Sequence, residues 1–108
     1  MQTVGGIPLI SANLGDADGN FAQAVADALK GNFEGVVVLG TTCDGGVALV
    51  ASVAESLTNK AQAGKIIQAI APIVDGKGGG KLTQARGAGK DASMLGEALK
   101  EVPKILTN

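Results

Sequence analysis

Several residue types that commonly carry out chemistry are missing from this chain of 108 residues. It contains no histidine, tryptophan or tyrosine, and Cys43 is its single cysteine. Without histidine the chain lacks the commonest general base and the commonest metal ligand, and Cys43 has no histidine to activate it as a nucleophile. Its carboxylates are scattered over expected helix caps and surface positions. The sequence therefore predicts a domain that is not an enzyme by itself.

Cysteine and long apolar runs are also scarce. One cysteine cannot form an internal disulfide, which favours a reducing, cytoplasmic setting. No apolar run approaches the ~20 residues that cross a bilayer, and the N-terminal stretch lacks the basic and apolar regions of a signal peptide. We therefore expect a cytoplasmic protein with no membrane partner.

Aromatic residues are limited to Phe21 and Phe33, although 45% of the chain is hydrophobic. That composition supports one core in a single domain over residues 1–108, built from alanine, valine, leucine and isoleucine. Phe21 lies at core spacing in an expected helix, which leaves little aromatic surface for stacking on unpaired bases. Any contact with nucleic acid is therefore expected to involve phosphates, ribose hydroxyls and shape.

The first half of the chain predicts two layers of structure. Residues 7–13 form an expected strand, with Pro8 at its beginning or at a sheet edge. Asp16 or Asp18 caps a following helix, which Gly31 ends; its apolar stripe comprises Phe21, Val25, Ala28 and Leu29. The runs 35–40 and 47–53 flank the turn residues Asp44, Gly45 and Gly46, which predicts a β-hairpin whose first strand is central.

The second half predicts two more helices around a glycine-rich segment. Thr58 or Asn59 caps the first of them and Pro72 ends it; its stripe is Ala63, Ile66, Ile67 and Ile70. Residues 75–81 are expected to be a loop and 82–85 a short strand. Asp91 caps the last helix and Pro103 closes it, with an apolar face of Ala92, Leu95, Leu99 and Val102. The expected order is β-α-β-β-α-(β)-α, an α/β (α+β) fold with helices packed on a mixed sheet.

Positive charge is concentrated around the glycines. Between residues 75 and 90 the chain carries Lys77, Lys81, Arg86 and Lys90 against Asp75 alone, although the whole chain has a net charge of −1. Backbone amides of Gly78, Gly79 and Gly80 could approach a phosphate closely, and Lys60 and Lys65 are expected to add charge on the same side. An ordinary solvent-exposed loop with lysines is the alternative reading.

Known glycine motifs do not fit this segment. A P-loop requires serine or threonine after its lysine, whereas Leu82 follows Lys81. The spacing of Gly87, Gly89 and Ala92 satisfies a loose dinucleotide-binding pattern. However, the chain after it is too short for the acidic residue expected about 20 positions later.

The order of several segments resembles that of C-Ala, the C-terminal globular domain of alanyl-tRNA synthetases. These segments are residues 36–39, the Asp-Gly turn, 49–53, 63–67 and 76–81. The resemblance covers residues 5–105 and is most specific over 63–81. Lys81 stands where the related accessory domain of DHH-family phosphoesterases carries histidine, which favours the synthetase side. Arg86 departs from the family, which more often has a small residue there.

The resemblance implies a DHH-associated domain that contacts the elbow of tRNA-Ala. The family's glycine signature corresponds to Lys77, Gly78, Gly79, Gly80 and Lys81, and we expect Lys65 and Lys90 to contribute to RNA binding. ATP, magnesium and zinc would belong to catalytic and editing domains upstream in a parent alanine–tRNA ligase, so this domain is expected to hold no cofactor. The family's helical dimerisation segment is missing from the sequence, which predicts a fragment that is a monomer or a weak dimer.

Two alternatives remain open. The domain could be the accessory domain of a DHH-type phosphoesterase, in which the glycines hold a substrate phosphate beside a metal site on another domain. It could also be a non-catalytic oligomerisation module, which would have no affinity for RNA.

Overall fold

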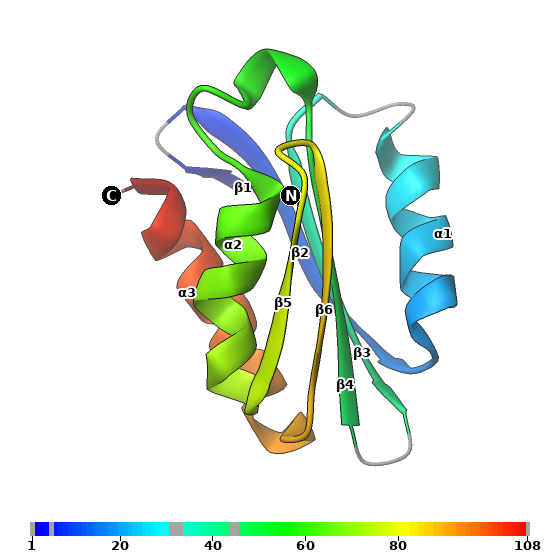
Figure 1. Cartoon of the computed structure of the whole chain (residues 1–108). Coiled ribbons are helices and arrows are strands. Elements are labelled where there is room, and N and C mark those ends of the chain that lie inside the picture. The colour runs from blue at the N-terminus through cyan, green and yellow to red at the C-terminus, as the bar shows by residue number, and fades with distance from the viewer. Residues whose placement is uncertain (1, 5, 31–33, 44–45, 108) are drawn as a thin grey trace.

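The computed structural model describes residues 2–4, 6–30, 34–43 and 46–107, and these form one sheet with helices on both faces (Figure 1). The six strands of the described residues lie in the order β1-β2-β3-β4-β6-β5, and only β2 and β3 are parallel. The strands are β1 (Gln2–Val4), β2 (Ile7–Asp16), β3 (Val36–Cys43), β4 (Gly46–Val53), β5 (Gly76–Gly80) and β6 (Gln84–Gly89). The α-helices are α1 (Gly19–Lys30), α2 (Ala63–Ile70) and α3 (Leu95–Thr107).

The helices divide the molecule into three layers. In Figure 1, α1 lies on one side of the sheet and α2 and α3 lie on the other. Because β2 and β3 are parallel neighbours, α1 is the crossover between them. The mixed-sheet prediction is therefore confirmed, and β1 is an addition that its three residues were too short to indicate. No helix among the described residues is long and apolar enough to span a bilayer.

The hairpin prediction for residues 35–53 is also confirmed. β3 and β4 pair in register from Val36 with Val53 to Cys43 with Gly46. Four consecutive residues of β3, from Val36 to Leu39, are buried because this strand has helices over both faces. The turn residues Asp44 and Gly45, the expected helix end at Gly31, and Phe33 lie outside the described residues.

β2 begins where its sequence predicts but continues beyond the expected end and contains a bulge. Pro8 lies at its second position, and the strand continues three residues beyond the expected Asn13. A register shift between Asn13 and Asp16 marks a bulge, where Gly15 has φ +82° and donates its N–H to the Asn13 Oδ1 at 2.8 Å. This left-handed conformation favours glycine at the bulge.

The expected apolar stripe of α1 is confirmed at Val25 and Leu29, which pack against the smaller core cluster, but is wrong at its other two positions. Phe21 is 51% exposed and Ala28 is exposed, whereas Ala22 and Ala26 are fully buried. The alanines face Val37, Leu39 and Val50 of the sheet, and their small side chains let the helix lie close to it, where a phenylalanine ring would not fit. The cap was correct, because Asp18 Oδ1 accepts a hydrogen bond from the Phe21 N–H at 2.8 Å.

α2 starts in a different way from that expected. Thr58 follows a 3₁₀ turn over Glu55–Leu57, so neither Thr58 nor Asn59 caps the helix. Instead the N–H groups of Ala63 and Gly64 donate to the Leu82 and Lys81 carbonyls at 2.9 and 3.0 Å. Backbone from the β5–β6 turn therefore satisfies the free helix N-terminus. The predicted end is confirmed, since the helix stops at Ile70 and Pro72 lies in a 3₁₀ turn.

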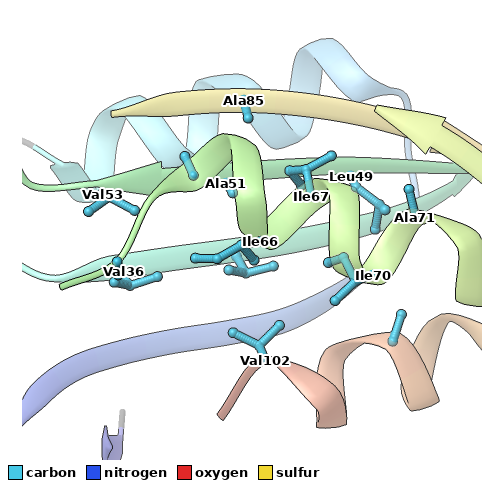
Figure 2. Close-up of a cluster of buried hydrophobic side chains, with 14 of the residues drawn as sticks. Val36, Leu49, Ala51, Val53, Ile66, Ile67, Ile70, Ala71, Ala85 and Val102 are labelled. Carbon is cyan, nitrogen blue, oxygen red and sulfur yellow. The ribbon is translucent and has the colours of Figure 1, made fainter. Parts of the chain in front are cut away.

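The larger core lies between the sheet and the two helices α2 and α3. Figure 2 shows Ile66, Ile67 and Ile70 of α2 among sheet side chains, together with Val102 of α3. The sheet contributes Val36, Leu49, Ala51, Val53 and Ala85 to this cluster. The predicted stripe of α2 is thus confirmed by burial.

α3 extends past the residue that was expected to close it. It runs through Pro103 to Thr107, because Val102 is fully buried and Ile105 packs against the core. Apolar burial on both sides of the proline offsets the backbone hydrogen bond that its missing N–H removes. Asp91 caps the 3₁₀ turn leading into the helix by accepting from the Ser93 N–H, as predicted for this end.

Replacing Gly96 with alanine is expected to raise the free energy of unfolding by about 0.5–1 kcal/mol. Gly96 is exposed in α3, and nothing lies within 4 Å of an added methyl group. Urea denaturation measures the change. Gly15→Ala is the matched control, since its methyl group also enters open space but its φ is +82°; it should destabilise the domain. Equal effects of the two variants would contradict this explanation.

Candidate nucleic-acid interface

The segment expected to be a glycine loop is a β-strand. Gly76–Gly80 forms β5 and pairs antiparallel with β6, which starts at Gln84 and not at Leu82. Glycine disfavours strands, so packing must account for this one. A methyl group at Gly78 would lie 2.5 Å from both the Ile67 Cγ2 and the Gly87 Cα. The strand therefore forms because glycines let α2 lie directly over it.

The three consecutive glycines have different surroundings. Beyond the chain neighbours, a methyl group at Gly79 would meet only the Gln68 side chain within 4 Å, with Nε2 at 3.3 Å. At Gly80, whose φ is +159°, it would lie 2.7 Å from the Gln84 carbonyl oxygen. The contacts that a methyl group would make therefore require glycine at positions 78 and 80 but not at 79.

The backbone of β5 is only partly available to a ligand. Lys81 donates its N–H to the Gln84 carbonyl at 2.8 Å, and hydrogen-bonded pairs alternate along an antiparallel ladder. By this alternation the N–H and C=O groups of Gly79 point toward β6. Those of Gly78 and Gly80 point away from it, toward the outer edge of the sheet. Only the amides of Gly78 and Gly80 are therefore open to a ligand at this edge, so the expected approach of all three glycine amides to one phosphate is not possible.

Lys77 and Arg86, the two cationic residues within the strands of this hairpin, share one face. Residues alternate between the two faces of a strand, and the face that packs against α2 contains Gly78, Ala85 and Gly87. Lys77 and Arg86 therefore lie on the opposite face, which is the side of the sheet that carries α1. The Arg86 guanidinium confirms this orientation, since Nη2 lies 2.5 Å from a methyl group built on Gly19 of α1.

We call this surface the basic face, defined by Lys77, Lys81, Arg86 and Lys90. Register pairs Lys77 with Ala88 and Gly79 with Arg86, so Lys77 and Arg86 are offset by one ladder step, about 7 Å along the strands. Lys77 and Lys90 line one hollow with Asp75, and Lys81 and Arg86 line another. All four cationic residues are exposed.

Lys65 is not part of the basic face. It lines a separate hollow with Asn59, Lys60 and Ile105, beside the start of α2 and the end of α3. The structure therefore brings Lys77 together with Lys90, and Lys81 together with Arg86, but places Lys65 elsewhere. Arg86 was missing from the expected site; the alternation of Arg86, Ala88 and Lys90 along a strand was the signal that could have found it.

The cations of the basic face form no ion pair with another described residue. Both ion pairs between described residues lie on α3, between Lys100 and Glu97 and between Lys104 and Glu101. Within this part of the chain no carboxylate lies within 4.0 Å of a cationic group on the basic face. The same residues contain no cluster of three acidic or cysteine side chains that could hold a metal ion.

Comparison with known proteins identifies the family of this chain. Residues 6–108 match the model of the DHHA1 domain. The chain belongs to the DHHA1 family. This DHHA1 domain is similar to a region of alanine–tRNA ligases: it is 40% identical over 102 residues to that of Solibacter usitatus and 43% identical over 102 residues to that of Picosynechococcus sp.. The matches cover 94% and 91% of the chain, but only 12% of each relative.

Solved structures give the same result for the fold of the DHHA1 domain. The C-Ala domain of alanyl-tRNA synthetase from Aquifex aeolicus superposes with a TM-score of 0.91, at 24% identity, over 99% of this chain and 97% of that one. A DHH-domain protein described as belonging to a family of ribosomal proteins gives 0.56 at 14% identity, over 83% of this chain and 21% of that one. The resemblance to C-Ala that the sequence indicated is confirmed.

Proposed function

We propose that this DHHA1 domain binds tRNA as part of an alanyl-tRNA synthetase, contacting the elbow of tRNA-Ala. The observation that supports it most directly is the basic face. Four cationic residues lie on one hairpin of a domain with a net charge of −1, with no carboxylate within ion-pair distance among the described residues. A polyanion is the ligand class that such an arrangement attracts.

The mode of binding would be recognition of backbone and shape. The chain has no tryptophan or tyrosine, and the exposed Phe21 lies on the flank of α1 away from the hairpin. At about 100° per helical residue, Phe21 and Gln23 lie on opposite sides of the buried Ala22. Contacts to phosphates and ribose hydroxyls therefore account for the interaction better than base stacking.

Other parts of the parent enzyme would supply the chemistry. Catalytic and editing domains elsewhere in the chain would bind ATP, magnesium and zinc, in the cytoplasm, and this domain would hold no cofactor of its own. Four cationic residues give a modest intrinsic affinity, which covalent attachment to those domains raises through effective concentration. By itself the domain would be a monomer or a weak dimer.

Titration of tRNA against the domain at increasing salt tests this proposal. The logarithm of the binding constant should fall linearly with the logarithm of salt concentration, by about 0.7–0.9 per phosphate contacted. The double variant Lys77→Ala/Lys81→Ala should bind more weakly and reduce the slope by about 1.4–1.8, because two contacts are lost. Fluorescence anisotropy of labelled tRNA measures both quantities.

Lys100→Ala is the matched control for charge. Lys100 is exposed on α3, in the layer on the other side of the sheet, and should leave the slope unchanged. An unchanged slope in the double variant would remove β5 from the binding surface. No measurable tRNA affinity in the parent domain would instead favour an oligomerisation module, which sedimentation analysis would detect.

A further inference from the structure

A groove separates the first turns of α1 from the β5–β6 hairpin. It has a volume of about 510 Å³ and lies on the same side of the sheet as α1. Its lining combines one residue of α1 with residues of the hairpin: Gln23, Gly79, Gly80, Lys81, Gln84, Ala85 and Arg86. Two cationic side chains, two amides and two glycines therefore surround one open space.

Gly19 determines where the Arg86 guanidinium lies. Any side chain at position 19 would begin 2.5 Å from the Arg86 Nη2. Gly19 does not have a positive φ, so its backbone conformation does not require glycine. Glycine here leaves room for the guanidinium, and an added methyl group would also lie 3.3 Å from the Ala48 Cβ.

Two cationic side chains and the N-terminus of α1 meet at this groove. The N-terminus of α1 carries partial positive charge, and the first turn of the helix contains no acidic residue. The Asp18 carboxylate caps this helix end by accepting from the Phe21 N–H and supplies one negative charge there. Lys81 adds a second cation on the groove wall. An anion in the groove would neutralise this accumulation.

The side-chain amides of Gln23 and Gln84 can form hydrogen bonds with the atoms on either side of a phosphate in a sugar–phosphate chain. Gln23 donates its Nε2 to the Asp27 Oδ1 at 3.0 Å, which orients its carbonyl oxygen as an acceptor for a ribose hydroxyl. The Gln84 side chain can both donate and accept. Gly79 and Gly80 contribute only backbone to the groove lining.

From this geometry we infer that the groove holds one phosphodiester group of the bound RNA, with Arg86 as its main ligand. Two parallel N–H groups of the guanidinium would donate to two phosphate oxygens, and Lys81 would add charge. This inference rests on the proposed function and deepens it. The RNA strand crosses the α1 side of the hairpin, and its contacts are not limited to the glycine edge.

Three variants test the groove, with tRNA as the probe. Arg86→Ala should weaken binding about tenfold or more and reduce the salt slope by about 0.7–0.9. Arg86→Lys should retain the slope but recover only part of the affinity, since lysine cannot form the two-point contact. Gly19→Ala retains every charge yet displaces the guanidinium, so it should weaken binding severalfold at an unchanged slope.

Gly96→Ala is the matched glycine control and should bind tRNA like the parent domain. Urea denaturation of Gly19→Ala should still show one cooperative unfolding transition at denaturant concentrations well above those of the binding assay, which separates displacement of Arg86 from unfolding. If Arg86→Ala and Gly19→Ala both bind normally while Lys77→Ala/Lys90→Ala, whose lysines lie outside the groove, binds weakly, the groove assignment is wrong and the proposed function survives. Absence of tRNA binding by the parent domain would overturn both.

Inorganic phosphate distinguishes a polynucleotide site from a site for a free anion. At constant ionic strength, millimolar phosphate should neither displace tRNA nor raise the stability of the parent domain. Stabilisation by phosphate that Arg86→Ala abolishes would overturn the RNA assignment and indicate a small-anion site.

Discussion

Replacing Ile67 with alanine should lower the free energy of unfolding by about 2–5 kcal/mol, a large fraction of the ~5–15 kcal/mol typical of a domain. Ile67 is fully buried in α2, and its Cγ2 fills the space over Gly78 and Gly87. Gly87→Ala should cost about 1–3 kcal/mol by overpacking, since its methyl group would lie 2.8 Å from that atom. Urea denaturation measures both changes.

The double variant Ile67→Ala/Gly87→Ala should lose less free energy of unfolding than the two single variants lose in sum. Removing Cγ2 makes room for the new methyl group, and contacting residues couple by about 0.5–3 kcal/mol. Ile70→Ala/Gly87→Ala is the control: Ile70 is equally buried in α2 but is not one of the three nearest neighbours of that methyl group. Strict additivity in the first pair would mean that α2 does not determine the glycine positions.

The second large effect concerns neighbouring glycines. Gly78→Ala should destabilise the domain by about 3 kcal/mol, at the upper end of overpacking costs, because two of the three clashes are with backbone atoms that cannot turn aside. These are the Gly87 Cα at 2.5 Å and the Arg86 carbonyl oxygen at 2.7 Å. Thermal or urea denaturation of the variant measures the loss.

Gly79→Ala is the matched control and should remain within about 0.5 kcal/mol of the parent domain. Its methyl group meets only the flexible end of Gln68. Equal destabilisation at positions 78 and 79 would contradict the packing described for β5. If Gly79→Ala folds normally, its tRNA affinity also reports whether a phosphate approaches this glycine, without interference from unfolding.

Patterns with strong periodicity predicted structure well. The β3–β4 hairpin, the buried stripe of α2, the break at Pro72 and the cap at Asp18 all depend on a few neighbouring residues. Local steric preference and apolar spacing determine such features, so they can be read from the chain. The resemblance to C-Ala used the same segments and is confirmed by the family match and the superposition.

The errors share a different cause. Five residues of which four are glycine carry no side-chain alternation, so nothing local indicates that Gly76–Gly80 is a strand. The rotation of α1 depends on which side chains fit against β3 and β4, and this placed Ala22 and Ala26 inside instead of Phe21. α3 continues past Pro103 because Val102 is buried and Ile105 packs against the core.

The sequence by itself determined the mixed α/β fold, its membership of a recognisable family and the concentration of positive charge between residues 75 and 90. Only the tertiary structure decided which of those charges act together. Packing of α2 over Gly78 and Gly87 fixes the register of the hairpin, and that register places Lys77 and Arg86 on the α1 side and leaves Lys65 elsewhere. A face shared by residues of two strands depends on their pairing, which no single segment encodes.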